Sequence, residues 1–412
     1  KEWIQPREYS SSKDSSVLRI ATYNILADQN ARRDGEKSSN SLMQQTEAFM
    51  IKTHRMPMIV AELLAYDADL ICLQEVDQSV YRELLEPTLQ ACNYQGYFGA
   101  KKSKGTLEGC ALFWSLRAFE EITDKESMQT LCISNLFPKD GIIATEEKEA
   151  EVVDTTHKDW TKVYQDVATL LGEHDELNKI VHRKLGQVVQ VATLRLKNDP
   201  SSKILVANTH LFFHPFASHI RVLQALMICH HLHEIQHKQQ QQYPTMLCGD
   251  LNAHTTSGPI ELLHTRGKLA PPSNTFERTW RHLHAFVWDV PTTEANQAVP
   301  GNIHIDFDTL LDPDSDKGKV QPLPLELPGK RWQLAYNEMP EFTHCIEKFQ
   351  GTLDHILLQS TNERWWNPID SAPMPARGMI TKYGFMPNAH MPSDHVSIVC
   401  DVELKNNEQD NT

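Results

Sequence analysis

The sequence lacks any apolar run close to the roughly 20 residues that a membrane-spanning helix requires. We therefore predict a soluble protein that does not act in a membrane. Cysteine is also sparse, with 8 residues scattered over 412 positions and no CxxC pair. Cys72, Cys248 and Cys400 lie inside apolar runs, where a free thiol behaves as a small hydrophobic side chain. This pattern favours a reducing compartment over a secreted disulfide scaffold.

Positive charge is in short supply as well. The chain has 40 Lys and Arg against 54 Asp and Glu, a formal net charge of −14. This balance argues against a protein that coats nucleic acid electrostatically, although a local basic cleft could still hold a few nucleotides. The basic loop with Lys101, Lys102 and Lys104 is interpreted as a solvated surface rather than a substrate-binding one.

Residues 290–341 form the longest irregular region. They are rich in Pro, Asp and Gly and exceed an ordinary connection in length. Because no strand-like run with a motif falls inside them, we predict one catalytic domain over 17–404 with an insertion at about 290–341. An N-terminal extension at 1–16 and a polar tail at 405–412 would flank it. The chain begins with Lys1 rather than Met, so we expect a processed or trimmed product whose targeting segment is not visible.

Short β-type runs alternate with helical patterns along the chain, which predicts α/β sheets packed together with helices outside. Polar residues stand at the ends of these runs: Asn24, Glu75, His210, Asp250 with Asn252, and Asp394 with His395. Such side chains, gathered at the edge of a sheet, can bind a hard metal ion and a phosphate. The pattern predicts a metal-dependent phosphodiesterase.

Glu75 is the strongest single candidate for a metal ligand, because a carboxylate after a buried strand is costly without a partner. The alternative is a helix cap or a loop carboxylate. Asn24 could complete the metal site or orient Glu75, and an Asx turn would explain it equally well. Asp250 and Asn252 would share one side of their run, which suits an acid that orients or deprotonates water and an amide that holds phosphate.

The Asp394-His395 pair suggests an acid–imidazole partnership, in which a carboxylate raises the pKa of a ring that donates to an oxyanion. Adjacent residues on an extended chain point in opposite directions, so Asp394 is a poor partner for His395. Asp354, at the start of another apolar run, is the better partner, and this leaves Asp394 for a metal.

A competing motif spans His233 to His237, a literal HExxH that on a helix would place two imidazoles on one face for Zn²⁺. The nearby sequence offers no convincing third ligand, and a zinc peptidase would leave the strand-end acids unexplained. We therefore interpret this motif as a solvated, polar helix end.

Six short motifs occur in order over nearly the whole chain: Tyr23–Leu26, Leu73–Val76, Asn208–Leu211, Cys248–Asn252, Leu353–Ile356 and Pro392–His395. Together they resemble the endonuclease/exonuclease/phosphatase superfamily. The sequences of Tyr23–Asp28 and Cys72–Asp77 resemble those of its deadenylase branch, the carbon-catabolite-repression type. Within that branch, Asn208–Pro215 resembles the mitochondrial 2′,5′-phosphodiesterases and Gly109–Phe113 resembles the nocturnins.

The resemblance implies a four-layer α/β sandwich, with two mixed β-sheets packed face to face and helices outside. It also implies Mg²⁺, for which Mn²⁺ can substitute, bound through Glu75 with Asn24 and Asp394 contributing. The implied location is intracellular, in the mitochondrial matrix, with the cytoplasm as the alternative.

The catalytic roles implied by the resemblance concern five residues. Asp250 would handle the attacking water, and His395, paired with Asp354, would stabilise the transition state. Asn252 and His210 would touch the scissile phosphate. A catalytically silent RNA-binding module would be expected to have lost Glu75, Asp250 or His395, and all of them are present.

The implied substrate is adenine-rich RNA or 2′,5′-oligoadenylate, cut from the 3′ end with release of 5′-AMP. Phe342 falls where this branch places an aromatic that stacks a terminal base, although a core Phe explains it equally well, and His214 would be a further substrate contact. His355 departs from the family, which usually has Tyr there. A nocturnin-like phosphatase acting on a nucleotide cofactor is the alternative.

Overall fold

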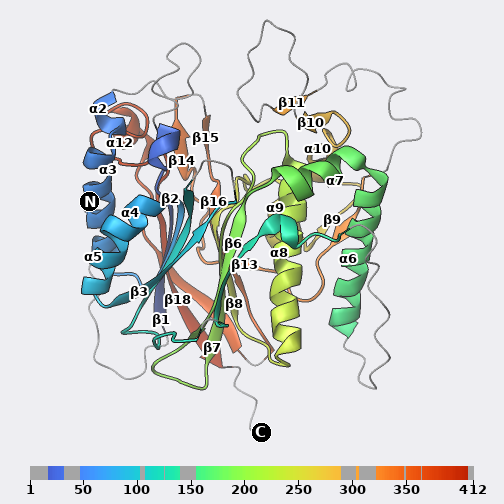
Figure 1. Cartoon of the computed structure of the whole chain (residues 1–412), viewed down its shortest axis with the longest axis horizontal. Helices are drawn as coiled ribbons and strands as arrows, with labels where there is room; N and C mark the ends of the chain where they lie inside the picture. Colours follow the sequence, from blue (N-terminus) through green and yellow to red (C-terminus); the bar gives the residue numbers. More distant parts are fainter. Residues whose placement is uncertain are drawn as a thin grey trace, which may run out of the picture.

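The computed structural model describes residues 17–31, 47–102, 107–124, 126–139, 155–288, 303–305, 322–347, 349–362 and 364–406. The predicted N-terminal extension at 1–16, Lys104, most of the predicted 290–341 insertion and residues 407–412 of the predicted tail lie outside these ranges. Two six-stranded sheets stand side by side in the centre of the molecule, with helices on both outer sides (Figure 1).

The first sheet joins the two ends of the described chain. Its strand order is β17 (Arg364–Ser371), β18 (Ile398–Asn406), β1 (Val17–Asn24), β2 (Leu70–Asp77), β4 (Glu108–Ser115) and β3 (Tyr94–Ala100). Only β1 and β2 run parallel, so the sheet is mixed.

The second sheet repeats this plan with one parallel pair. Its order is β13 (Gln333–Leu334), β16 (Asp354–Gln359), β8 (Thr245–Asp250), β7 (Lys203–His210), β6 (Val188–Arg195) and β5 (Met128–Cys132). The parallel pair is β7 and β8. Three two-stranded ribbons add to the sheets: β9 (Lys268–Leu269) with β12 (Leu325–Glu326), β10 (Phe286–Trp288) with β11 (Ile303–Ile305), and β14 (His344–Ile346) with β15 (Phe349–Gly351).

Helices form the two outer layers (Figure 1). Beside the first sheet lie α2 (Glu47–Met50), α3 (Lys52–Tyr66), α4 (Gln78–Val80) and α5 (Glu86–Ala91), with α12 (Arg377–Thr381) near one end. Beside the second lie α6 (Thr155–Glu173), α7 (Asp175–Lys179), α8 (Ser218–Lys238), α9 (Gly258–Ile260) and α10 (Asn274–Trp280). Single turns of π-helix occur at Tyr81–Leu85, Ile180–Lys184 and Glu261–Thr265, and a 3₁₀ turn at Ile133–Asn135. Within the described residues, no helix combines the length and apolar character needed to cross a bilayer.

Three apolar clusters separate the four layers. The middle cluster takes side chains from both sheets, among them Ile20, Cys72, Val206 and Ile356. The other two fill the space between each sheet and its helices. Alternate strand residues therefore bury both faces of each sheet, which confirms the predicted four-layer α/β sandwich.

Gly249, the penultimate residue of β8, is required by the backbone of the neighbouring strand. Its φ is +140°, and a Cβ there would lie 1.9 Å from the carbonyl oxygen of Thr209. We expect Gly249→Ala to lower the free energy of unfolding by about 3 kcal/mol or more, because backbone strain and overlap add. The measurement is chemical denaturation. Gly172→Ala is the matched control, because a Cβ at this α6 position meets nothing within 4 Å and Ala favours helix. A loss in both variants would contradict the argument.

Candidate active site

The two parallel strand pairs bring the predicted polar residues to one end of the sandwich. Parallel β1 and β2 end at Asn24 and just beyond Glu75, and β7 and β8 end together at His210 and Asp250, which are register partners. Asp250 is also the register partner of Asp354 on β16. Carboxyl ends of parallel strands are where open sheets place ligand-binding groups.

The backbone around these residues adopts conformations that L-residues rarely take. Glu75 has φ +52° and Asn252 has φ +47°, and β2 carries a register shift between Leu73 and Val76. A bulge of this kind re-aims a side chain at the edge of a sheet. Left-handed non-glycine residues cost free energy and cluster at functional sites. The bulge interrupts the β2 ladder next to Glu75, whose left-handed φ is of the kind that clusters at functional sites.

Glu75 is held by three donors. Its carboxylate accepts hydrogen bonds from Asn30 Nδ2 at 2.6 Å, the Ala27 backbone N–H at 3.1 Å and Asn24 Nδ2 at 3.3 Å. Burial raises the pKa of Glu75, and the nearby carboxylates of Glu108 and Asp394 raise it further, against His210.

Asp250 stands at the centre of the site and is buried. Its Oδ2 lies 3.0 Å from Asn24 Nδ2, 3.5 Å from His210 Nε2 and 3.7 Å from His395 Nε2, and its Oδ1 accepts the Asn252 backbone N–H at 2.8 Å. Burial opposes its ionisation, but His210 and His395 outweigh burial and hold the pKa of Asp250 below its usual value. Asp250 is therefore an ionised carboxylate with two imidazoles against it.

His395 forms the predicted pair with Asp354. Its Nδ1 lies 2.7 Å from Asp354 Oδ2, which fixes the ring and turns Nε2 toward Asp250. Burial disfavours the charged imidazole, but Asp354, Asp394 and Asp250 together raise the pKa of His395 to about 10. The ring is thus cationic at neutral pH and can donate from Nε2. The prediction that Asp354, not the adjacent Asp394, pairs with His395 is confirmed.

Asp394 faces a residue that sequence reasoning missed. Its Oδ2 lies 3.3 Å from His344 Nε2, and Ser393 Oγ donates to its Oδ1 at 3.3 Å. Burial opposes ionisation, but His395 and His344 together hold the pKa of Asp394 well below its usual range. His344 precedes Asp354 by ten residues, on the separate ribbon β14, and no local pattern marks it.

Asn24 orients carboxylates in this arrangement. Its Oδ1 accepts the Leu26 N–H at 3.0 Å, as in an Asx turn, and its Nδ2 donates to both Glu75 and Asp250. The two sequence-based interpretations of Asn24, an Asx turn and a residue that orients Glu75, therefore hold together.

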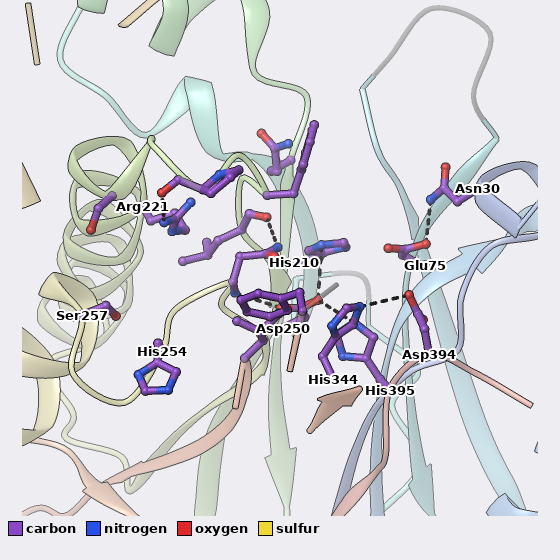
Figure 2. Close-up of a pocket in the computed structure, with 18 of the residues that line it drawn as sticks. Asn30, Glu75, His210, Arg221, Asp250, His254, Ser257, His344, Asp394 and His395 are labelled. Carbon is purple, nitrogen blue, oxygen red and sulfur yellow. Dashed lines mark hydrogen bonds and ion pairs between the residues drawn. The ribbon is translucent and has the colours of Figure 1, made fainter. Parts of the chain in front are cut away.

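A cavity of about 1050 Å³ opens over these residues and has two unlike halves. Figure 2 shows Glu75 and Asp394 on one side, His210, His344 and His395 around Asp250 in the middle, and Arg221, His254 and Ser257 on the other side. Arg221 is buried, donates to backbone carbonyls, and has no ion pair with a carboxylate within the described part of the chain. Burial lowers its pKa to about 10, so it remains charged at neutral pH. The second half of the cavity thus presents a buried cation that has no ion pair among the described residues.

Two residues predicted to contact the substrate, Phe342 and His214, do not line the cavity. Phe342 is only 3 % exposed and packs in a small apolar cluster, so it cannot stack a substrate base. The exposed aromatic is Phe349, 42 % accessible, which lines the cavity and lies 5.4 Å from the His344 ring. His214 packs against Phe286 outside the cavity lining, whereas Phe213 and Pro215 on either side line it.

The basic loop also differs from its interpretation as a solvated surface. Lys101 lines the cavity and forms an ion pair with Glu108 at 3.0 Å, because Lys101 follows β3 where it pairs with β4. Lys102 is exposed, as expected.

The donor set fits a hard divalent cation. Glu75, Asp250 and Asp394 line one cavity and supply carboxylate oxygens, which Mg²⁺ and Mn²⁺ prefer. Burial, together with the carboxylates of Glu108 and Asp394, raises the pKa of Glu75, and a divalent cation would favour its ionised form.

The sequence is similar to two kinds of named protein. It is 27% identical over 397 residues to 2′,5′-phosphodiesterase 12 of Mus musculus, covering 95% of this chain and 52% of that protein. It is 24% identical over 425 residues to CCR4-NOT transcription complex subunit 6-like-A of Xenopus laevis, covering 98% of this chain and 66% of that protein. The chain thus spans about half the length of the 2′,5′-phosphodiesterase that it matches.

The fold is similar to that of ANGEL2, a 2′,3′-cyclic phosphatase solved with adenosine-2′,3′-vanadate. The TM-score is 0.63 at 18% identity, over 94% of this chain and 96% of that one. The human nocturnin catalytic domain with bound sulfate follows at a TM-score of 0.50 and 20% identity, over 94% of each chain. The family model for the Endonuclease/Exonuclease/phosphatase family matches residues 21–395, which include every residue of the site described above. The chain belongs to the Endonuclease/Exonuclease/phosphatase family.

Proposed function

We propose that this protein is a Mg²⁺- or Mn²⁺-dependent phosphodiesterase that removes nucleotides one at a time from the 3′ end of adenine-rich RNA or 2′,5′-oligoadenylate and releases 5′-AMP. The observation that carries the proposal is the juxtaposition of a cationic His395, an ionised Asp250 and a half-buried Glu75 around one cavity. The names of the phosphodiesterase and CCR4-NOT relatives support an oligonucleotide substrate.

The metal would be held by Glu75, with Asp394 and Asn24 beside it. When bound, it would neutralise charge on the phosphoryl oxygens.

The chain's own residues supply the proton chemistry. Asp250 Oδ2 would orient the attacking water and accept its proton, because the carboxylate is ionised and Asn24 Nδ2 fixes its position. His395 would donate from Nε2 to a phosphoryl oxygen as negative charge develops there, while Asp354 holds the ring. His210 and Asn252, on either side of Asp250, would contact the same phosphate.

The other half of the cavity would hold the next nucleotide. Three residues that line this half, Arg221, Ser257 and Thr279, each carry a buried polar atom. Arg221 Nε and the two hydroxyl oxygens have no hydrogen-bond partner among the described residues. Buried polar groups are costly without partners, and phosphate and ribose oxygens would supply them. This polar wall favours a substrate of more than one nucleotide.

A catalytically silent binding module does not account for the paired, oppositely charged His395 and Asp250. A nocturnin-like phosphatase acting on a nucleotide cofactor uses the same chemistry, so the substrate decides between the two. The test is hydrolysis of 2′,5′-linked and 3′,5′-linked oligoadenylates side by side with Mg²⁺, with nucleotide cofactors and nucleoside 2′,3′-cyclic phosphates as competitors. We expect a ladder that shortens by single nucleotides, with 5′-AMP released. Internal cuts, or turnover of the small substrates alone, would reject the exonuclease.

Phe349 is the proposed stacking platform for the terminal base. Because stacking of one base contributes roughly 1–3 kcal/mol, we expect Phe349→Ala to weaken use of oligoadenylate about tenfold or more. A small activated phosphodiester, which has no base to stack, should be cleaved at the wild-type rate. The measurement is kcat/KM on both substrates.

Two further variants sharpen this prediction. Phe349→Trp keeps a flat ring and should retain oligoadenylate cleavage. Phe342→Ala removes a core ring and should lower stability, affecting both substrates alike. Equal losses on both substrates for Phe349→Ala would mean that Phe349 stacks no base.

A further inference from the structure

The HExxH motif of α8 gains a third imidazole in the folded protein. His157, in the first turn of α6, lies against the last turns of α8, where His233 and His237 occupy one helix face. His157 Nδ1 is 3.2 Å from His233 Nε2, and one ring nitrogen from each of the three histidines lies within 4.8 Å of the others. His233 is 8 % exposed, so the interpretation of this segment as a solvated helix end is wrong.

The spacing matches a tetrahedral transition-metal site. Two nitrogens bound to one Zn²⁺ at 2.0–2.1 Å stand about 3.3 Å apart in tetrahedral geometry, close to the 3.2 Å between His157 and His233. A carboxylate completes the set, because Glu234 Oε1 lies 3.6 Å from His157 Nδ1. Three imidazoles favour Zn²⁺ and similar borderline cations over Mg²⁺, which prefers oxygen.

One ring must turn before an ion can bind. The rings of His157 and His237 stack with centroids 3.7 Å apart and planes 3° apart, so their in-plane lone pairs run side by side. Rotation of the His237 ring about its Cβ–Cγ bond would end this stacking without moving His157 from His233 and Glu234, and the His237 side chain is half-buried. None of the three histidines lines the active-site cavity, so the cluster is separate from the catalytic residues.

We propose that His157, His233 and His237, with Glu234, form a binding site for Zn²⁺ or a similar transition-metal cation that ties α6 to α8. The bound metal would link His157 to His233, which are 76 residues apart in the sequence. Metal that binds only the folded state stabilises that state. The site would therefore hold one outer helix against the other.

The test measures bound zinc in the full chain after chelation, dialysis and reloading with Zn²⁺. Because the catalytic carboxylates and imidazoles can also take up zinc, the readout is the difference between wild type and His157→Ala/His237→Ala. We expect the double variant to bind one equivalent less, and the affinity of the single variant His157→Ala to fall by about a hundredfold or more, since even outer-shell changes cost 10–100-fold. Zn²⁺ should raise the melting temperature of wild type more than that of the double variant.

The matched control is His230→Ala, which removes another imidazole from the same helix interface, where it stacks on Tyr164 outside the cluster. It should retain the full zinc content. Hydrolysis of oligoadenylate with Mg²⁺ should be unchanged in all three variants, which keeps this test independent of the proposed function. Equal zinc in wild type and the double variant, or equal loss in His230→Ala, would overturn the proposal.

Discussion

Glu75→Ala is expected to abolish hydrolysis while leaving the fold intact. Glu75 is a half-buried carboxylate whose pKa is raised by desolvation and by neighbouring acids, and it is the strongest candidate for the metal ligand. Removal of metal from wild type by excess chelator should have the same effect, and Mg²⁺ or Mn²⁺ should restore activity. The measurement is turnover of oligoadenylate, with circular dichroism and thermal melting as checks on the fold.

Two comparisons separate the loss of the metal ligand from general damage. Glu75→Gln keeps the volume and the hydrogen bonds to one oxygen but removes the charge, so it should be nearly as inactive as Glu75→Ala. Glu108→Gln changes a carboxylate of the same cavity that Lys101 already neutralises, and it should retain most activity. Full hydrolysis by Glu75→Ala, or by wild type in excess chelator, would rule out the assigned role.

Asp250→Asn and His395→Ala are each expected to lower kcat by at least about a hundredfold, the usual contribution of general acid–base and oxyanion-stabilising groups. The amide of Asp250→Asn could not accept a proton as the carboxylate does. His395→Ala would remove the cationic donor from the site. Affinity for oligoadenylate should change much less, because both groups act mainly in the transition state. Single-turnover kinetics and equilibrium binding measure the two effects separately.

Asp354→Asn tests the pairing within the same site. Asp354 touches His395 Nδ1 and not the substrate cavity, so it is a positioning residue. The variant should lose kcat while KM stays near the wild-type value, and an Asn that still accepts a hydrogen bond should retain more activity than Asp354→Ala. A fall in affinity parallel to the fall in kcat, for any of these variants, would contradict the roles assigned here.

Much of the site could be predicted because parallel strands place their carboxyl ends at the same edge of a sheet. Asn24, Glu75, His210 and Asp250 each follow an apolar run, and parallel strands bring such ends together. The choice of Asp354 over Asp394 as the partner of His395 followed from the alternation of side chains along an extended chain. The six motifs between Tyr23 and His395 extended these local rules through their resemblance to a known family, which implied the four-layer fold.

The residues that sequence reasoning missed have their roles set by contacts that no local pattern reveals. Phe342 precedes the β14–β15 ribbon and Phe349 is the first residue of β15, and local pattern cannot tell which ring is covered by the cluster around Met386 and which borders the cavity. His344 reaches Asp394 over 50 residues of sequence.

The sequence by itself determined which chemical groups stand at the strand ends, because hydrophobic periodicity and polar breaks are local properties of the chain. Only the tertiary structure decided which groups meet across layers: His344 with Asp394, Phe349 with the cavity, and His157 with the HExxH helix. The physical reason is that such contacts depend on how two sheets and their helices pack, and packing is set by the whole set of buried surfaces rather than by any one segment.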